Sequence, residues 1–199
     1  MVLEFLQRYP DIQVELTLND RFVDLVEDGV DVAMRLGQVL PPNVVARHVA
    51  VSPRYFVAAP RYLQDKPQLR RIGDLRHFEY VRFAWLASGD MLEVQGPQGK
   101  TRIRTPGRYS VNSSMAIRDC LRSAVALGMS PEWLVKDLID SGELVRVLPR
   151  WSAPSQMLYL VYPSRRYQPL RARVFMEFVI EKLQSMPGFK PINGAAVPR

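Results

Sequence analysis

The stretch DRFVDLVEDGVDVAMRLG, residues 20–37, changes its hydrophobic period halfway, and no other feature constrains the fold as much. Its first half places apolar residues at the spacing of one helical face, namely Phe22, Leu25 and Val26. In its second half, apolar residues alternate with others as in a strand, namely Val30, Val32 and Met34. The segment therefore predicts a helix followed directly by a strand, which is half of an α/β unit.

The neighbouring segments extend this alternation. Residues 2–9 have helical spacing and stop before Pro10, whereas residues 12–18 alternate strictly and predict a strand with one polar face, either an edge strand or one that meets a partner. Residues 44–60 predict two extended segments interrupted at Ser52-Pro53. Helices and strands in this order are typical of the α/β class.

Further elements follow after residue 76 and indicate a second lobe. The predicted elements are a strand at 77–83, a hairpin or loop at 89–107, helices at 114–124 and 131–141, strands at 143–148 and 156–163, and a helix at 168–184. Periodicity turns Met115 inward in the first of these helices, and Leu170 and Val179 in the last. The tail from Pro187 shows no periodicity, so we expect it to be loose unless it is docked.

Composition excludes several classes of protein. The chain has 199 residues, 47% of them hydrophobic, which is enough for a sizeable core. No apolar run reaches the roughly 20 residues of a membrane helix, and acids interrupt the region where a secretory signal is apolar. We therefore expect a cytoplasmic protein. Cys120 is the only cysteine, so no disulfide can form within the chain, which suits a reducing compartment.

Charge is distributed unevenly. Residues 1–36 hold three arginines against eight carboxylates, a balance of −5, so the rest of the chain carries +12 for a net charge of +7. The basic residues between 61 and 108 are scattered and lack the interleaved aromatic side chains of a single-strand binding platform. We interpret them mainly as a solvated face, with one or two directed toward an anionic ligand.

The sequence shows no catalytic or metal-binding constellation. His48 and His77 are the only histidines, too few beside one cysteine for the usual zinc sites. The sequence contains no nucleophile elbow, Walker loop or dinucleotide fingerprint. Cys120 lies on the apolar face of a predicted helix, where burial favours an inert thiol. We expect no catalysis and no cofactor.

Six motifs, in order, resemble the effector-binding domain of LysR-type transcriptional regulators. They are FLQRYPDIQVEL, D..VDLVEDGVDVAMRLG, VARHVAVSPRYFVAAPRYL, DLRH, SGELVRVLPRW and LVYPSRR..P.RARVFMEFV, and the resemblance covers about residues 1–185. The resemblance implies the two-lobed α/β fold of type II periplasmic binding proteins, with two crossing strands and a ligand in the interlobe cleft. It assigns residues 1–75 plus 153–199 to lobe I and residues 76–152 to lobe II.

Two departures from the family pattern stand out. The chain begins inside the helix that should follow the first strand of lobe I, so we expect that strand to be lacking. The sequence ALGMSPEWL replaces a longer Gly-x-Gly strand, which shortens one strand of lobe II. The family's N-terminal winged helix-turn-helix DNA-binding domain is also absent from this chain.

Candidate ligand contacts come from both lobes. A strand that ends in Arg35-Leu36-Gly37 brings Arg35 and Gly37 to the carboxyl end of a sheet, where α/β folds bind ligands. The Arg35 guanidinium could hold a carboxylate with two hydrogen bonds or, alternatively, pair with Asp31 or Asp28.

The second set of candidates lies in lobe II. Asn112, Ser113 and Ser114 open a predicted helix whose free N–H groups favour an anion, although ordinary N-capping explains the same residues. Arg82 and Phe83 end a strand that should face them, or are a surface arginine and a core phenylalanine.

The resemblance implies an effector-sensing and dimerising domain that binds a small, anionic molecule and contacts DNA only through the missing domain. A homodimer or tetramer is expected, with residues 2–18 at the dimer surface. A solute-binding receptor of a transport system is the alternative with the same fold. A direct nucleic-acid binder is a third reading, which requires tight, salt-dependent DNA binding by this chain alone.

Overall fold

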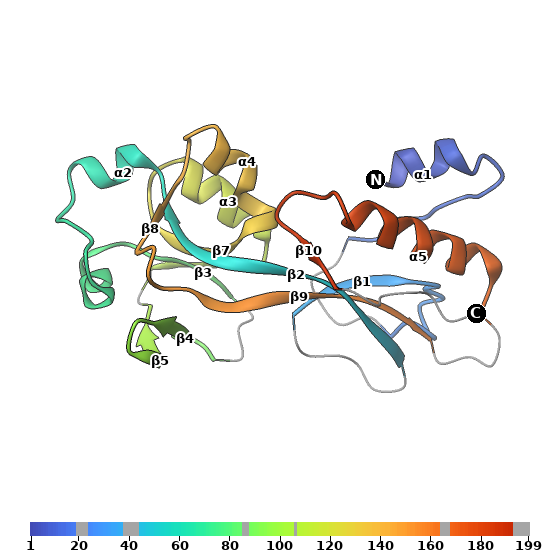
Figure 1. Cartoon of the computed structure of the whole chain (residues 1–199), viewed down its shortest axis with the longest axis horizontal. Helices are drawn as coiled ribbons and strands as arrows, with labels where there is room; N and C mark the ends of the chain where they lie inside the picture. Colours follow the sequence, from blue (N-terminus) through green and yellow to red (C-terminus); the bar gives the residue numbers. More distant parts are fainter. Residues whose placement is uncertain (19–23, 38–43, 85–87, 106, 164–167, 193–199) are drawn as a thin grey trace. The chain divides into compact units, whose positions relative to one another are not determined.

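The computed structural model describes residues 1–18, 24–37, 44–84, 88–105, 107–163 and 168–192 (Figure 1). Its helices are α1 (Val2–Arg8), α2 (Pro60–Gln64), the 3₁₀ helix η1 (Ile72–His77), α3 (Ser114–Arg122), α4 (Glu132–Asp140) and α5 (Leu170–Leu183). Its strands are β1 (Ala33–Leu36), β2 (Val44–Ala58), β3 (Val81–Phe83), β4 (Met91–Gly96), β5 (Gly99–Arg104), β6 (Tyr109–Val111), β7 (Gly128–Pro131), β8 (Val145–Val147), β9 (Ala153–Pro163) and β10 (Lys190–Pro191). The mixed α/β class expected from the sequence is confirmed.

The chain forms two compact units. Unit 1 consists of Met1–Val51 and Gln156–Arg199, and unit 2 of Ser52–Ser155. The long strands β2 and β9 each run from one unit into the other, as the two crossing strands of the expected fold should. The expected lobes and these units differ in the assignment of residues 52–75 and 153–155.

Strand β2 continues without a break through Ser52-Pro53, so the predicted interruption there is wrong. The reason is a change of partner along the strand. Ala50 and Val51 pair with β10, and pairing with β7 starts at Arg54. Proline lacks an N–H and is tolerated in a strand only where no ladder bond is needed, and Pro53 occupies such a position.

Unit 1 packs helices against a small antiparallel sheet. Strand β1 pairs with β9, and the core beneath α5 includes Val49, Leu158 and Val179. Helix α1 lies beside α5 (Figure 1), where its Phe5 ring meets the ring of Phe175 edge-on at 5.1 Å. The paired helices bury the one fully apolar side of α1.

Two predictions for unit 1 are wrong. Residues 12–18 form no strand, and the expected helix around residues 24–28 is a turn in which Leu25 is buried but Val26 is 62% exposed; Phe22 lies outside the described residues. Met34 is exposed, because Ala33 and Arg35 take the more covered face of β1. The described part of the tail is docked through β10, which pairs with β2.

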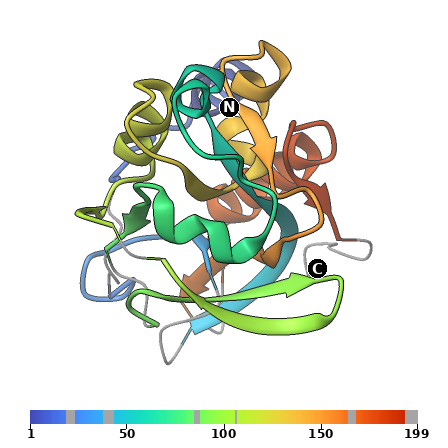
Figure 2. The same ribbon diagram turned by 90° about the vertical axis from the view of Figure 1, so that its left-hand side faces the viewer.

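Unit 2 has the larger core, formed by residues of β2, β7, α3, α4 and the β4–β5 hairpin. Figure 2 shows this hairpin as two long strands joined by a tight turn, which confirms the hairpin expected from residues 89–107. Strand β3 pairs in parallel with β6, and β2 pairs with both β7 and β8. The short strand β7 is present, with four residues paired to β2.

Two inward assignments on helices are wrong. Met115 is 58% exposed on α3, and Leu170 is 63% exposed at the start of α5. Both residues lie in the first turn of their helices, where the apolar face has not yet reached the core. The predicted inward positions Ile117, Leu121 and Val179 are buried.

Candidate functional site

The candidate residues of unit 2 lie on two neighbouring strands. Arg82 and Phe83 end β3, which pairs with β6 so that Phe83 is opposite Val111. Asn112 follows directly on β6 and is exposed, whereas Arg82 and Phe83 are half-buried. The structure thus brings the end of β3 next to the loop that starts α3, as neighbours on paired strands.

Ser113 caps helix α3. Its Oγ accepts a hydrogen bond from the backbone N–H of Ala116 at 3.3 Å, which confirms the N-capping interpretation. Ser114 is the first residue of the helix, and both serines are half-buried. The Ser113 side chain therefore already satisfies one of the free N–H groups at the start of α3. The other N–H groups of the first turn point toward the same N-terminal end of the helix.

The candidate residues of unit 1 lie at the end of β1. Arg35 is half-buried and opposite Tyr159 of β9, and this burial lowers the pKa of its guanidinium. The carboxylate of Asp31 binds Arg171, Nε to Oδ2 at 3.0 Å. Gly37 has a φ of +123°, which only glycine adopts easily, and its N–H donates to the carbonyl of Met157 at 2.9 Å.

Another half-buried arginine, Arg54 of β2, was not found by the sequence patterns. It is opposite Pro131, and burial lowers the pKa of its guanidinium while the charge of the nearby Tyr80 phenolate would raise it. Burial raises the pKa of Tyr80 itself to about 12. The sequence feature that could have indicated this residue is a single arginine in the largely apolar second half of β2. It was overlooked because a break in the strand was predicted at Pro53.

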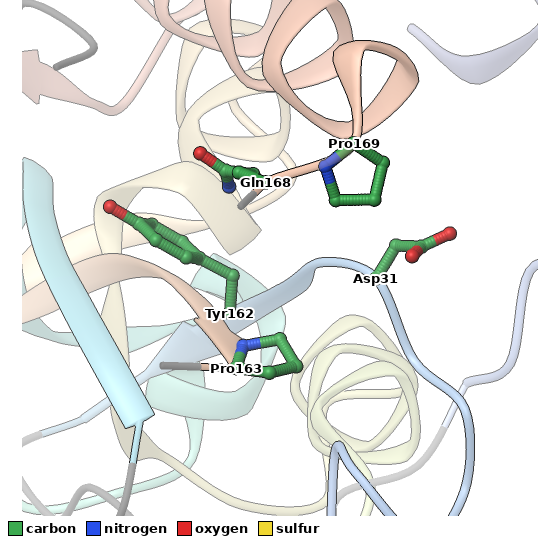
Figure 3. Close-up of a pocket in the computed structure, with 5 residues that line it drawn as sticks. All are labelled: Asp31, Tyr162, Pro163, Gln168 and Pro169. Carbon is green, nitrogen blue, oxygen red and sulfur yellow. The ribbon is translucent and has the colours of Figure 1, made fainter. Parts of the chain in front are cut away.

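Two hollows are found in the described part of the chain. One, in unit 1, measures about 10 Å³, room for a single water, and is lined by Asp31, Tyr162, Pro163, Gln168 and Pro169 (Figure 3). The other, in unit 2, is an open groove of about 470 Å³ between residues 63–70 and residues 145–149. None of the predicted site residues lines either of them.

The remaining reactive groups are dispersed. Among the described residues no three His, Cys, Asp or Glu side chains gather into a possible metal site. The Cys120 thiol is half-buried, and burial raises its pKa. The ring of His48 stacks on Tyr159 at 4.9 Å, and in the described part its buried Nε2 has no hydrogen-bond partner. The helices that the structure describes include none long and apolar enough to span a bilayer.

Comparison with known proteins identifies relatives over nearly the whole chain. The family model described as "LysR substrate binding domain" matches residues 1–184. The chain is 31% identical over 183 residues to the HTH-type transcriptional regulator PtxR of Pseudomonas aeruginosa, covering 92% of this chain and 59% of that protein. It is 31% identical over 197 residues to the HTH-type transcriptional activator TtdR of Escherichia coli strain K12, covering 98% and 63%.

Solved structures agree with these relatives. The regulatory domain of CrgA, a LysR-type transcriptional regulator from Neisseria meningitidis, superposes with a TM-score of 0.79 at 26% identity, covering 92% of this chain and 89% of that one. The full-length virulence activator AphB of Vibrio cholerae superposes with a TM-score of 0.78 at 25% identity, covering 91% and 62%. The CrgA chain is a regulatory domain, and the AphB match covers part of a full-length regulator. Both confirm the predicted type II periplasmic-binding-protein-like fold.

The curated relatives are named as transcriptional regulators, so the transport-receptor alternative is not favoured. The chain spans about 60% of the length of the relatives it matches. The family model, the curated relatives and the solved structures all lead to one assignment. The chain belongs to the LysR family and corresponds to its substrate-binding, regulatory domain.

Proposed function

We propose that this chain is the effector-sensing and dimerising part of a DNA-binding transcription regulator. The observation that carries the proposal is the family match over residues 1–184, which includes both units. In the proposed protein a small anionic effector binds to the regulatory domain, and an N-terminal winged helix-turn-helix contacts DNA. The domain has no catalytic role in this scheme.

The proposed effector contacts are Arg35 and Gly37 of unit 1 and Arg82, Phe83, Asn112, Ser113 and Ser114 of unit 2. Three features support the set in unit 2. Arg82 is half-buried at a strand end, the start of α3 adjoins it through β6, and the helix dipole at that start favours negative charge. A carboxylate bound there could accept hydrogen bonds from backbone N–H groups as well as from an arginine.

The proposed dimer surface is residues 2–18. Leu16 and Leu18 are 60% and 86% exposed, and residues 12–18 pair with no strand that the structure describes. Exposed leucines next to unpaired backbone favour association with a second chain. We propose that a second copy of the domain covers this segment in a homodimer, or in a tetramer built from such dimers.

A thermal-shift screen tests the sensing function. The chain is heated with aromatic and aliphatic carboxylates, amino acids and sugars. A ligand at about 100 times its dissociation constant adds about 2.7 kcal/mol to the stability, which shifts the melting temperature by several degrees. Arg35→Ala and Ser113→Ala should reduce that shift, whereas Arg102→Ala, on the exposed face of β5, should not.

Loss of the Ser113 cap also lowers the stability of the free protein by about 1 kcal/mol. The ligand-induced increment in each variant, rather than its absolute melting temperature, is therefore compared with the wild type. A ligand whose increment is the same in all variants would place effector binding away from the proposed residues. A cooperative melt with no shift for any compound in the four classes would count against small-molecule sensing.

A further inference from the structure

Arg54 is partly covered by protein and has no acidic partner in the described part of the chain, which is an unusual environment for an arginine. It is half-buried in unit 2, and no carboxylate among the described residues forms an ion pair with it. Asp20, which belongs to the unit 1 segment, is the one side-chain carboxylate outside the described residues. A partly covered guanidinium without a counter-ion loses part of its hydration, and an anion bound beside it would compensate for that loss.

Arg54 of β2 and Arg82 of β3 lie on the same side of their strands, although β3 belongs to a separate two-stranded sheet that is joined to the β7 segment by one isolated bridge. Phe56 is opposite Met129 and Arg54 is opposite Pro131, so these side chains share one face of β2 and β7. Tyr80 forms a parallel bridge with Leu127, two residues before Met129, and therefore belongs to the same face. Arg82 follows Tyr80 by two residues and shares its side of β3.

Tyr80, which lies between the two arginines in this arrangement, interrupts the backbone hydrogen bonding between the β3 and β7 segments. The Val81 N–H donates to the Leu127 carbonyl in the usual ladder, but the next N–H along β7, that of Met129, donates to the Tyr80 hydroxyl at 3.0 Å. The side chain of Tyr80 thus replaces a backbone partner. With its oxygen accepting from Met129, the hydroxyl hydrogen of Tyr80 remains available to donate to a third group.

One acid near this face, Asp90, already has an arginine partner. Arg82 is close enough to Asp90 to lower the pKa of that carboxyl, but the first cause of the lowering is Arg104, which donates from Nε to Asp90 Oδ2 at 2.5 Å. Asp90 is thus already engaged by another arginine. Two arginines and a hydroxyl donor therefore share this face, and no ion pair between these arginines and an acid is found among the described residues.

We propose that Arg54, with Arg82 and the Tyr80 hydroxyl, forms an anion site on this face of unit 2 that selects a small carboxylate as the effector. This inference rests on the proposed sensing function and adds a residue and a ligand class to it. The carboxylate accepts two hydrogen bonds from the Arg54 guanidinium, and the Tyr80 hydroxyl or Arg82 holds a second acceptor of the same molecule. Because β7 separates the two arginine strands, their backbones lie about 10 Å apart, a span suited to a compact organic acid.

Binding of succinate, benzoate and inorganic phosphate to this chain tests the site. Each salt is titrated at constant ionic strength against sodium chloride, with isothermal calorimetry and thermal shift as readouts. At least one of the two carboxylates should stabilise the wild type beyond chloride. Arg54→Gln should weaken binding of that carboxylate at least tenfold. Arg54→Lys keeps the positive charge but loses the paired N–H donors of the guanidinium, so it should weaken binding by a smaller factor.

The matched control is Arg102→Gln, which removes the same charge from an exposed position on β5 and should change the affinity less than twofold. Arg54→Gln should also melt no lower than the wild type without ligand, because it removes a covered cation that has no counter-ion. A clear fall in that melting temperature would make Arg54 a structural residue and overturn the site.

The two proposals fail in different ways. If neither carboxylate stabilises the wild type beyond chloride, or if Arg54→Gln binds within twofold of the wild type, the anion site is wrong. The sensing function is then tested by the amino acids and sugars of the wider screen. A neutral compound that binds equally to wild type and Arg54→Gln would preserve sensing and reject the carboxylate class.

Discussion

The indole ring of Trp151 occupies the space that a side chain at Gly96 would need, since an added Cβ would lie 2.3 Å from ring atom Cζ3. The same region is joined by the backbone, where the Gln95 N–H donates to the Ser152 carbonyl at 2.7 Å and the Ser152 N–H returns to Gln95. Glycine at 96 therefore lets the β4–β5 hairpin close against the start of β9.

Gly96→Ala should destabilise the protein by about 1–3 kcal/mol, because the ring or the hairpin must move to admit the methyl group. The measurement is the midpoint of urea unfolding followed by tryptophan fluorescence and circular dichroism. Gly73→Ala is the matched control, since nothing lies within 4 Å of its added Cβ. Equal losses at the two positions would show that the ring contact has no energetic weight.

The ion pair between Arg118 and Asp137 should make helix packing in unit 2 sensitive to acid. Arg118 of α3 donates to both carboxylate oxygens of Asp137 on α4, at 2.6 and 2.5 Å, and also to the carbonyl of Leu134. The hydrogen bonds from Arg118 lower the pKa of Asp137 from 3.8 to about 2. Since the folded state holds the proton more weakly than the unfolded chain, the pair stabilises the fold above about pH 4 and this contribution is lost as the pH falls toward 2.

Asp137 is 67% exposed, so we expect Asp137→Asn to cost less than about 1 kcal/mol at pH 7. Arg118→Ala should cost more, about 1–2 kcal/mol, because it also leaves the Leu134 carbonyl without its donor. Urea unfolding at pH 7 and pH 3 measures both effects, and the difference between the wild type and Asp137→Asn should be smaller at pH 3 than at pH 7, without vanishing, because the folded carboxyl still holds most of its charge one unit above its pKa. A constant difference between them would contradict the pKa shift.

The exposed leucines at 16 and 18 should control self-association. Replacing both with aspartate should shift the protein from dimer to monomer, because it puts charge into the surface that the proposed partner covers. Light scattering after size exclusion, over a range of concentrations, measures the change. Leu170→Asp, 63% exposed on α5, is the matched control and should leave the mass unchanged. A double variant that remains dimeric would place the dimer surface elsewhere.

The Cys120 thiol should react slowly with disulfide reagents. Burial raises its pKa above the ordinary value of 9.0, so little thiolate is present near neutral pH. The rate with a coloured disulfide should rise across pH 7–9.5 without a plateau, and urea should accelerate it strongly. Rapid reaction of the folded protein at pH 7 would instead indicate an activated, redox-sensitive cysteine.

The parts of the fold that depend on local periodicity could be predicted from the sequence. Helices α4 and α5, the hairpin and the apolar strand β9 follow from spacing and turn residues. The strand predicted at 12–18 is absent. An alternating pattern shows that a segment is compatible with a strand, but it does not show whether a neighbouring strand pairs with it. The continuity of β2 was missed for the same reason. A proline is tolerated where a strand changes its pairing partner, and local sequence does not reveal which strands pair.

The candidate site divides in a similar way. The Ser113 cap and the adjacency of Arg82 and Phe83 to α3 could be expected from short motifs. Arg54 could not, because its position opposite Pro131 and its shared face with Tyr80 depend on strand register. An arginine that lacks a carboxylate is recognised only after all neighbouring acids have been located.

The route of the chain through β2 and β9 has a consequence for how the protein is made. Unit 2 is the uninterrupted segment 52–155, whereas unit 1 is assembled from both ends of the chain. Its core needs Leu158 and Val179 as well as Val49, which are far apart in sequence and costly to bring together early. On the ribosome, unit 2 can therefore fold as soon as its own residues emerge, and the N-terminal segment must wait, with Phe5 uncovered, until α5 has been synthesised.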